Sequence, residues 1–334
     1  MVRQWFASIL MMAMMLASEP ARAAEPFTIR IASVGVAAIL PVLFGKPEVL
    51  PHSGASYRVE FVNFAGSAAA LTALATGDIQ IAGLAYSSLG LAIQNAHMSD
   101  LRIILDGFQD GVDDYFSTPY FVRNDGGINS IADLKGKVLA SNGIGGAVDM
   151  GIRFNLRKHG LEEKRDYTII EAQFPSMRAV LAEKRADLVG IVPPFAFDPW
   201  FKENAHALFT EKDSLGATQQ LVYVARAGLI AQNRAAFLDF VEDLQRSLRY
   251  MLMQEHRGEA IEIAARFTKQ PAQNFEAWFL TKRDYYRDPT ARPNLANLQR
   301  NMETQRDLGF LKETIKVADY ADLSLIDEAE KRLK

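Results

Sequence analysis

Short β-rich runs alternate with helical stretches from residue 27 to about residue 226 of this chain, and this alternation constrains its fold most. Strands that alternate with helices are typical of βαβ units, in which mostly parallel sheets are covered on both faces. We therefore expect an α/β fold. The expected strands are residues 28–33, 58–62, 79–82, 102–107, 118–122, 137–140, 167–171, 188–191 and 220–225, and the expected helices are 68–76, 87–96, 147–159 and 176–184.

The pattern becomes wholly helical after Gly228. Asn233 is placed to cap a helix in which large apolar residues recur every three to four positions, as one buried helical face requires. Further helices are expected at about 271–287 and 295–308, separated by the turn signals Asp288-Pro289 and Arg292-Pro293.

The α/β part contains an internal repeat. A serine, a second serine and an aspartate follow each other at intervals of 34 and 11 residues in the first half and of 35 and 11 in the second. The pattern predicts two similar βαβαβ halves, each able to form a small doubly wound lobe. The residues are Ser33, Ser67 and Asp78, then Ser141, Ser176 and Asp187.

Ligands of open parallel sheets bind beyond the carboxyl ends of the strands, where helix N-termini point inward. Each half offers two such ends: Ser33 and residues 66–67, then residues 141–143 and 175–176. Small residues leave helix N–H groups uncovered, and the helix dipole favours an anion there. Each serine has the alternative role of a helix N-cap, which does not exclude ligand contact. We expect these helix starts to converge on one cleft if the halves face each other.

The run Asn142-Gly143-Ile144-Gly145-Gly146 follows an expected strand and precedes an expected helix. A dinucleotide fingerprint would need its third glycine at Val148, so nucleotide binding is not expected. The glycines still allow a small anionic group to approach the backbone N–H groups.

Aromatic residues lie just past several expected strand ends, namely Tyr86, Phe174 and Phe195. Aromatic walls with a few polar groups are typical of small-ligand pockets, although packing between sheet and helix is the alternative. Arg178 lies one turn inside the helix that Ser176 opens. It can bind an anionic group through two hydrogen bonds or form a surface salt bridge.

Residues that carry catalytic chemistry are sparse. The chain has no cysteine, which excludes disulfides, thiol nucleophiles and cysteine-based zinc sites. The 5 histidines are scattered without metal-ligand spacing, and no GxSxG motif is present. Asp106 and Asp110 lie in what reads as a polar connector, so we expect solvated charges there. The formal charge of −3 predicts no nucleic-acid partner. We expect no catalytic residue, metal or cofactor.

Residues 1–23 have the features of a secretory signal peptide: Arg3, an uncharged stretch, and Ala21-Arg22-Ala23 before the expected cleavage point. The uncharged stretch is shorter than the ~20 residues that span a bilayer. Without cysteine the N-terminus has no site for a lipid anchor. We therefore expect an exported periplasmic protein that is not lipid-anchored.

Three stretches carry a resemblance to a known family: residues 59–67 with 73–79, residues 131–138 (IADLKGKV) and residues 318–324 (ADYADLS). In these the chain resembles the nitrate/sulfonate/taurine-type periplasmic substrate-binding proteins of ABC importers, a group related to thiamine-pyrimidine-precursor-binding proteins. It departs from the family pattern at Tyr86-Ser87-Ser88, where a Gly-Asp pair is frequent, and at Val192-Pro193-Pro194-Phe195. The loss of an acid there favours an anionic ligand, and the second departure indicates a retuned lining.

The resemblance implies a two-lobed periplasmic binding protein of type II, a Venus flytrap, with two hinge strands and a helical C-terminal tail. We place the hinge strands at 117–122 and 220–226. The first lobe is then expected at 24–117 plus 226–334, and the second at 118–225.

The expected function is that of a monomeric receptor that closes on a small organic anion, an aromatic carboxylate or a sulfonate, and delivers it to an ABC transporter permease. Two alternatives remain: an enzyme on the same fold, as in thiamine-pyrimidine synthesis, and a ligand-sensing module for a signalling partner. The candidate ligand-binding residues are Ser33, Gly35, Gly66, Ser67, Tyr86, Ser87, Thr118, Asn142, Gly145, Gly146, Phe174, Arg178 and Phe195.

Overall fold

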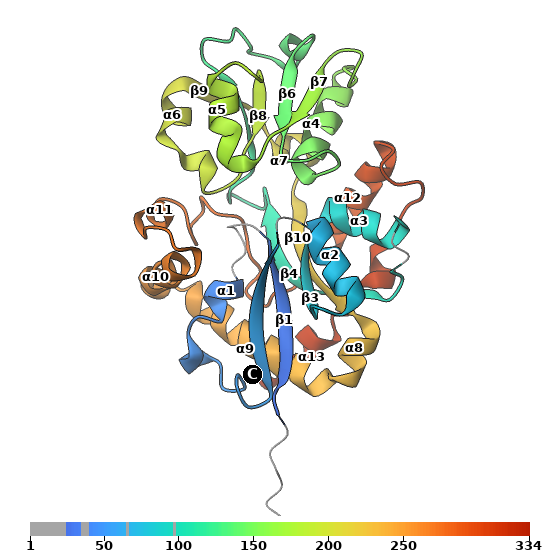
Figure 1. Cartoon of the computed structure of the whole chain (residues 1–334), viewed down its shortest axis with the longest axis vertical. Coiled ribbons are helices and arrows are strands. Elements are labelled where there is room, and N and C mark those ends of the chain that lie inside the picture. The colour runs from blue at the N-terminus through green and yellow to red at the C-terminus, as the bar shows by residue number, and fades with distance from the viewer. Residues whose placement is uncertain (1–24, 35–39, 65–66, 96–97) are drawn as a thin grey trace, which may run out of the picture.

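The computed structural model describes residues 25–34, 40–64, 67–95 and 98–334 (Figure 1). The expected signal peptide at 1–23 and the candidates Gly35 and Gly66 lie outside the described residues. None of the helices in these ranges is long and apolar enough to span a bilayer.

Two separate five-stranded sheets form the framework of the molecule, one below the other in Figure 1. The first has the order β2-β1-β3-β10-β4, and β1 is parallel to β2 and β3, whereas β10 is antiparallel to β3 and β4. We call this sheet and the helices that cover it the first lobe. Its strands are β1 (Phe27–Val34), β2 (Tyr57–Phe64), β3 (Ile81–Ala85), β4 (Leu101–Asp110) and β10 (Thr218–Arg226).

The second sheet repeats this arrangement in the order β7-β6-β8-β5-β9. Here β6 is parallel to β7 and β8, whereas β5 is antiparallel to β8 and β9. The predicted internal repeat is therefore confirmed at the level of sheet topology. This sheet and its helices form the second lobe, with strands β5 (Pro119–Arg123), β6 (Val138–Ser141), β7 (Thr168–Glu171), β8 (Leu188–Gly190) and β9 (Ala205–Thr210).

Helices cover both faces of both sheets (Figure 1). In the first lobe they are α1 (Leu40–Leu43), α2 (Ser67–Thr76), α3 (Tyr86–Asn95), α8 (Ala227–Gln232), α9 (Arg234–Met251), α10 (Arg257–Thr268), α11 (Gln273–Glu276), α12 (Leu295–Asp307) and α13 (Ser324–Arg332). In the second lobe they are α4 (Ala147–Lys158), α5 (Met177–Ala182), α6 (Pro199–Asn204) and α7 (Glu211–Leu215). Short 3-10 turns are η1 (Pro47–Val49), η2 (Ile131–Leu134), η3 (Phe174–Ser176), η4 (Phe195–Phe197), η5 (Gln254–His256) and η6 (Val317–Tyr320).

Alternation along the strands explains why each sheet carries two cores. In β10, Leu221 and Tyr223 pack into the core under α9 and α10, whereas Val222 and Val224 pack into the core with α3 and α12. Successive strand residues point to opposite faces, so an apolar run serves both cores at once. The second sheet does the same on a smaller scale through β6 and β8.

The structure differs from the sequence prediction in three elements. The helix expected at 271–287 is reduced to α11, because residues 284–291 run along β4 and hydrogen-bond to its backbone at Asp106 and Gln109. Strand β9 was not predicted. β10 pairs with β3 and β4 of the first sheet, although its residues up to 225 were expected in the second lobe.

Candidate functional site

Two connections link the lobes: residues 111–118 between β4 and β5, and residues 211–217 between β9 and β10. The carboxyl ends of β3 and β6 lead into α3 and α4, and these helices approach each other across the lobe boundary (Figure 1). The carboxyl ends of β3 and β6 therefore lie where the two lobes meet, and the ligand site expected there stays a prediction.

One edge of this boundary is closed by contacts of α4 with α3 and the end of α12. The hydroxyl of Tyr86 donates to the carbonyl of Ala147 at 3.5 Å. The Arg153 guanidinium lies 5.6 Å over the ring of Phe310, and the Arg157 side chain donates to the Asp307 carbonyl at 2.9 Å. These pairs join the second lobe to the first.

An aromatic cluster joins the lobes elsewhere along the boundary. Phe197 of η4 lies 5.6 Å from Phe116 and stacks at 6.1 Å on Trp278, while the Arg283 guanidinium lies 4.7 Å over its ring. Phe197 was not among the candidates. Its neighbour Phe195, which was, packs against the core of the second lobe itself.

Tyr86 and Ser87 are enclosed at the start of α3. Both are almost completely buried, and burial raises the pKa of Tyr86, as do the nearby carboxyls of Glu211, Asp110 and Asp149. The Ser87 hydroxyl has no hydrogen-bond partner among the described residues. The Tyr86 side chain thus supports the contact between the lobes, and contact of Tyr86 and Ser87 with a ligand stays a prediction.

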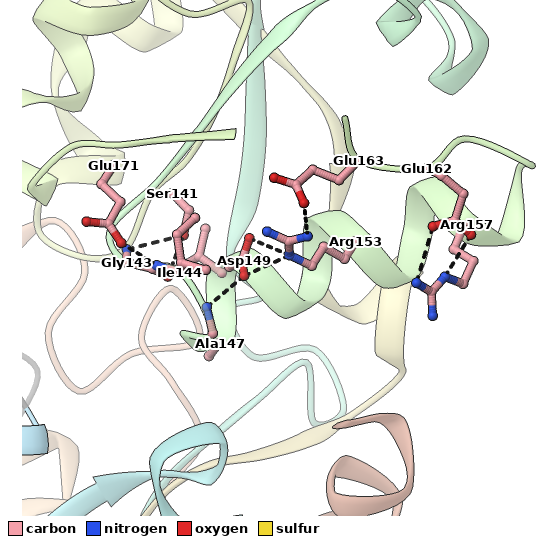
Figure 2. A network of polar contacts seen from close by, with 12 residues as sticks. Ser141, Gly143, Ile144, Ala147, Asp149, Arg153, Arg157, Glu162, Glu163 and Glu171 are labelled. Carbon is pink, nitrogen blue, oxygen red and sulfur yellow. Dashed lines mark hydrogen bonds and ion pairs between the residues drawn. The ribbon is translucent and has the colours of Figure 1, made fainter. Parts of the chain in front are cut away.

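Two backbone N–H groups of the glycine loop, residues 141–146, donate to carboxylates of the chain itself (Figure 2). The Ile144 N–H donates to Glu171 at 2.7 Å, and the Gly145 N–H donates to Asp149 at 2.7 Å. The Gly146 N–H donates to the Gly143 carbonyl at 3.0 Å. This differs from the expectation that Gly145 and Gly146 offer free N–H groups to an external anion. Asn142 lies half-buried at the start of the loop.

The Asp149 carboxylate compensates the partial positive charge at the start of α4, because the N-cap residue, Gly146, has no side chain to do so. Both carboxylate oxygens of Asp149 accept from Arg153 Nε at 2.9 Å, and Arg153 also donates to Glu163 at 2.8 Å. Burial raises the pKa of Asp149, and the hydrogen bonds from Arg153 and Gly145 oppose that rise. The start of α4 is thus electrostatically satisfied within the second lobe.

The other candidates of the second lobe lie near its own core or at its surface. Phe174 is half-buried and packs against the second-lobe cores. Arg178 is exposed, with its Nε 3.5 Å from an Asp198 carboxylate oxygen. In the first lobe, Ser33 lies on β1 and Ser67 begins α2, but the description does not extend to their side chains.

Thr118 belongs to a buried polar group that we call the hinge cluster. An Asp110 oxygen accepts from the Thr118 N–H at 2.9 Å and from its hydroxyl at 2.6 Å, and that hydroxyl lies 3.0 Å from the Tyr285 hydroxyl. The Glu211 N–H donates to the Thr118 carbonyl at 2.8 Å, and the Tyr120 hydroxyl donates to the Glu211 carboxyl. The cluster thus includes residues from both connections and both lobes.

The expectation of solvated charges at Asp106 and Asp110 is wrong. Asp110 is fully buried, and burial raises its pKa to about 6. Burial also raises the pKa of Asp106 to about 7, with Gln219 donating to it at 2.6 Å and the Asp288 N–H at 3.0 Å. The signal in the sequence was the apolar run Ile103-Ile104-Leu105 directly before Asp106, which marks a buried strand rather than a connector.

A group of possible metal ligands lies far from this boundary. His52, Asp239 and Glu242 have ligand atoms within 4.8 Å of one another. Glu242 is already paired with Arg246 at 2.7 Å and Asp239 with Arg332 at 3.0 Å. Two guanidinium groups on these carboxylates disfavour a cation there, because they already compensate the negative charge.

A protein-family model described as NMT1/THI5 like matches residues 55–257 of the chain. No curated protein matches its sequence significantly.

Several solved structures share the fold at low identity. The periplasmic aliphatic sulphonate binding protein SsuA from Escherichia coli is 17% identical, with a TM-score of 0.70 over 88% of this chain and 92% of that one. The periplasmic nitrate-binding protein NrtA from Synechocystis PCC 6803 is 16% identical, with a TM-score of 0.73 over 93% and 90%. The desulfurization enzyme DSZB is 16% identical, with a TM-score of 0.61 over 92% and 100%. These matches confirm the two-lobed fold of type II periplasmic binding proteins.

Proposed function

Because the chain belongs to the NMT1/THI5-like family, we propose that it is a periplasmic solute-binding receptor of an ABC importer. Its ligand is a small organic anion, an aromatic carboxylate or a sulfonate. The lobes close over the ligand, and the closed form docks on the membrane permease. The sulphonate- and nitrate-binding proteins that share the fold support this proposal.

One observation carries the proposal: two lobes of equal sheet topology meet at the carboxyl ends of their parallel strands. In the described part of the chain two connections join them, and the contacts across the boundary include single rings and side chains such as Phe197 and Tyr86. Contacts of this kind can separate and re-form as rigid lobes rotate about a hinge. A ligand drives closure only if it binds the closed state better than the open one.

The anion selectivity rests on the first lobe. Helices α2 and α3 have no acidic residue in their first turns, whereas the first turn of α4 contains Asp149. The absence of an acidic residue from the first turns of α2 and α3 leaves their N-termini favourable to a negative group. We therefore propose that the acid group of the ligand binds near Ser33 and Ser67, while the second lobe covers its remainder.

A thermal-shift screen of the chain from residue 24 onwards tests this function. The panel contains alkane sulfonates, aromatic sulfonates, aromatic carboxylates, nitrate and a pyrimidine. We expect at least one organic anion to raise the melting temperature in a concentration-dependent manner, since a ligand that binds only the native state stabilises it. Absence of any shift across the panel would contradict the proposal.

An enzyme on the same fold is the second candidate, because a desulfurization enzyme shares the architecture. The chain has no cysteine, so a reaction that needs a thiol nucleophile has none here. Incubation of the protein with aromatic sulfinates and sulfonates, followed by assay for released sulfite, separates the two candidates. A receptor binds without turnover, whereas an enzyme releases product at a rate proportional to its concentration.

A further inference from the structure

The hinge cluster lies where both connections between the lobes pass. Asp110 ends β4 in the first lobe, and Thr118 precedes β5 in the second. Glu211 follows β9, directly before the chain returns to the first lobe. The Thr118 hydroxyl links Asp110 to Tyr285, so the same few hydrogen bonds hold residues of both lobes together.

The two carboxyls of this cluster lack a cationic partner. Within the described ranges, no salt bridge involves Asp110 or Glu211, and one oxygen of each has no hydrogen-bond partner. Lys212, which follows Glu211 in the chain, donates its ammonium group to the Asp113 carbonyl at 2.7 Å. A buried carboxylate without a cation or a full set of donors is costly, so the neutral form is favoured as long as water is excluded.

We propose that Asp110 and Glu211 form a proton-controlled hinge: the neutral pair stabilises the closed arrangement of the lobes, and its ionisation opens the hinge. The inference rests on the closure that the proposed function requires, but not on the identity of the ligand. Opening would admit water to the two carboxyls, and a solvated carboxylate no longer carries the cost of burial. Ionisation and opening are therefore linked, and each favours the other.

The other titratable groups around Asp110 and Glu211 do not change the expectation that the neutral carboxyls favour closure. Tyr120 from β5, Tyr86 from α3 and Tyr285 from the segment after α11 face it with hydroxyls, which stay neutral because burial raises the pKa of each further. Asp149 of α4 adds negative charge near Tyr86, and Lys212 of α7 weakly favours the charged form of Asp110. Among these side chains only Lys212 is positive.

The pKa shifts agree with the geometry. Burial is the largest cause of the raised pKa of Glu211, and the charge of Asp110 adds to it. Burial likewise raises the pKa of Asp110 to about 6, against the hydrogen bonds from Ser117 and Thr118. Because the pKa of Asp110 is raised to about 6 in this structure, its contribution to closure is present at low pH and is lost as the pH rises through about 6. The raised pKa of Glu211 acts in the same direction.

Distance measurement between the lobes tests the proposal without any ligand. The chain has no cysteine, so Lys135→Cys in the second lobe and Lys316→Cys in the first provide two unique labelling positions. Spin labels there report the distribution of distances between the lobes at about pH 5 and about pH 8. We expect the closed fraction relative to the open fraction to fall about tenfold. A carboxyl with a pKa of about 6 in the closed form and its ordinary pKa in the open form changes the ratio by about this factor between the two pH values.

Two variants identify the groups responsible. Glu211→Gln and Asp110→Asn keep an oxygen for the Tyr120 and Thr118 donors and place an uncharged amide where each oxygen is unpartnered. We expect the double variant to stay closed at both pH values. Glu183→Gln, an exposed acid of the second lobe, is the matched control and should keep the pH response.

A pH response that persists in the double variant would overturn the proposal, and so would a distance distribution of the labelled wild type that is the same at both pH values. A circular dichroism spectrum at each pH confirms that the variants are folded. The ligand screen is independent of this experiment. A protein that binds no anion but opens with pH refutes the proposed function alone, and one that binds an anion but ignores pH refutes the hinge alone.

Discussion

Asp149 and Asp110 are both fully buried aspartates near the lobe boundary, yet their surroundings are opposite. Asp149 accepts from Arg153 and the Gly145 N–H, and so satisfies the start of α4 as a carboxylate. Within the described structure, Asp110 accepts from the N–H and the hydroxyl of Thr118, with no cation paired to it and one oxygen unpartnered. The partner, not the burial, decides whether a buried acid is charged.

This difference divides the boundary into two regions with separate roles. The start of α4 is a fixed charged network that keeps the glycine loop in one conformation. The hinge cluster has no such charge compensation and responds to its own protonation. In the proposed receptor, one side of the lobe boundary is therefore rigid and the hinge is adjustable.

Removal of the Asp149 carboxylate is expected to have the largest effect. Asp149→Ala leaves Arg153 half-buried with only Glu163 and strips the start of α4 of its acid. We expect the free energy of unfolding to fall by about 4 kcal/mol, as when one partner of a buried ion pair is removed. Urea denaturation followed by circular dichroism measures this change.

The matched control is Glu162→Ala, which removes an exposed acid from its pair with Arg157 on the same helix (Figure 2). Such surface pairs contribute about 0.5 kcal/mol, so the control should stay close to wild type. Equal losses for the two variants would contradict the fixed network assigned to Asp149.

Asp110→Asn is expected to act in the opposite direction. The pKa of Asp110 is raised to about 6 by burial, so its neutral form stabilises the fold below about pH 4, and this contribution is lost as the pH rises to about 6. Asparagine does not titrate. Relative to wild type, the variant should gain about 2 kcal/mol in free energy of unfolding between about pH 4 and about pH 7.

Urea titrations of both proteins across this range check the sign. The Asp110→Asn variant still contains Asp106, whose pKa is raised to about 7. Its free energy of unfolding should therefore still fall as the pH rises, but less steeply than that of the wild type. A variant that loses stability relative to wild type as the pH rises would show that Asp110 is charged and paired.

Glu171→Gln is expected to have the smallest effect, and it acts on ligand affinity. The exposed Glu171 carboxylate holds the Ile144 N–H and places a negative charge beside the glycine loop. Its removal should strengthen binding of an organic anion by about threefold, because one repulsive charge near the site is lost. Isothermal titration with the best anion of the screen measures this. A weaker affinity would mean that Glu171 positions the loop for the ligand.

The fold was largely predictable from the sequence because alternating strands and helices and the repeated Ser, Ser and Asp spacing both reflect local chain geometry. The prediction of a helix at 271–287 was wrong because tertiary contacts override the local pattern: residues 284–291 hydrogen-bond along β4. Strand β9 was missed because its run, Ala205–Thr210, is short and has a histidine in it.

The candidate site was predictable only in part. Loop glycines after a strand predicted N–H groups for an external anion, but the sequence did not reveal that Glu171 and Asp149 of the chain itself accept from the loop. Thr118 was named without its partners, because Asp110, Glu211 and Tyr285 come together only through the crossing of the two connections. The sequence predicted Phe195 and not Phe197 at the boundary, because alternation along a short turn does not tell which ring faces the other lobe.

Small-angle X-ray scattering with and without the best anion of the screen tests the central claim most directly. We expect a saturating organic anion to reduce the radius of gyration toward that of the closed form, with one ligand bound per chain and no product formed. An unchanged radius of gyration together with turnover of the anion would contradict a receptor that works by lobe closure.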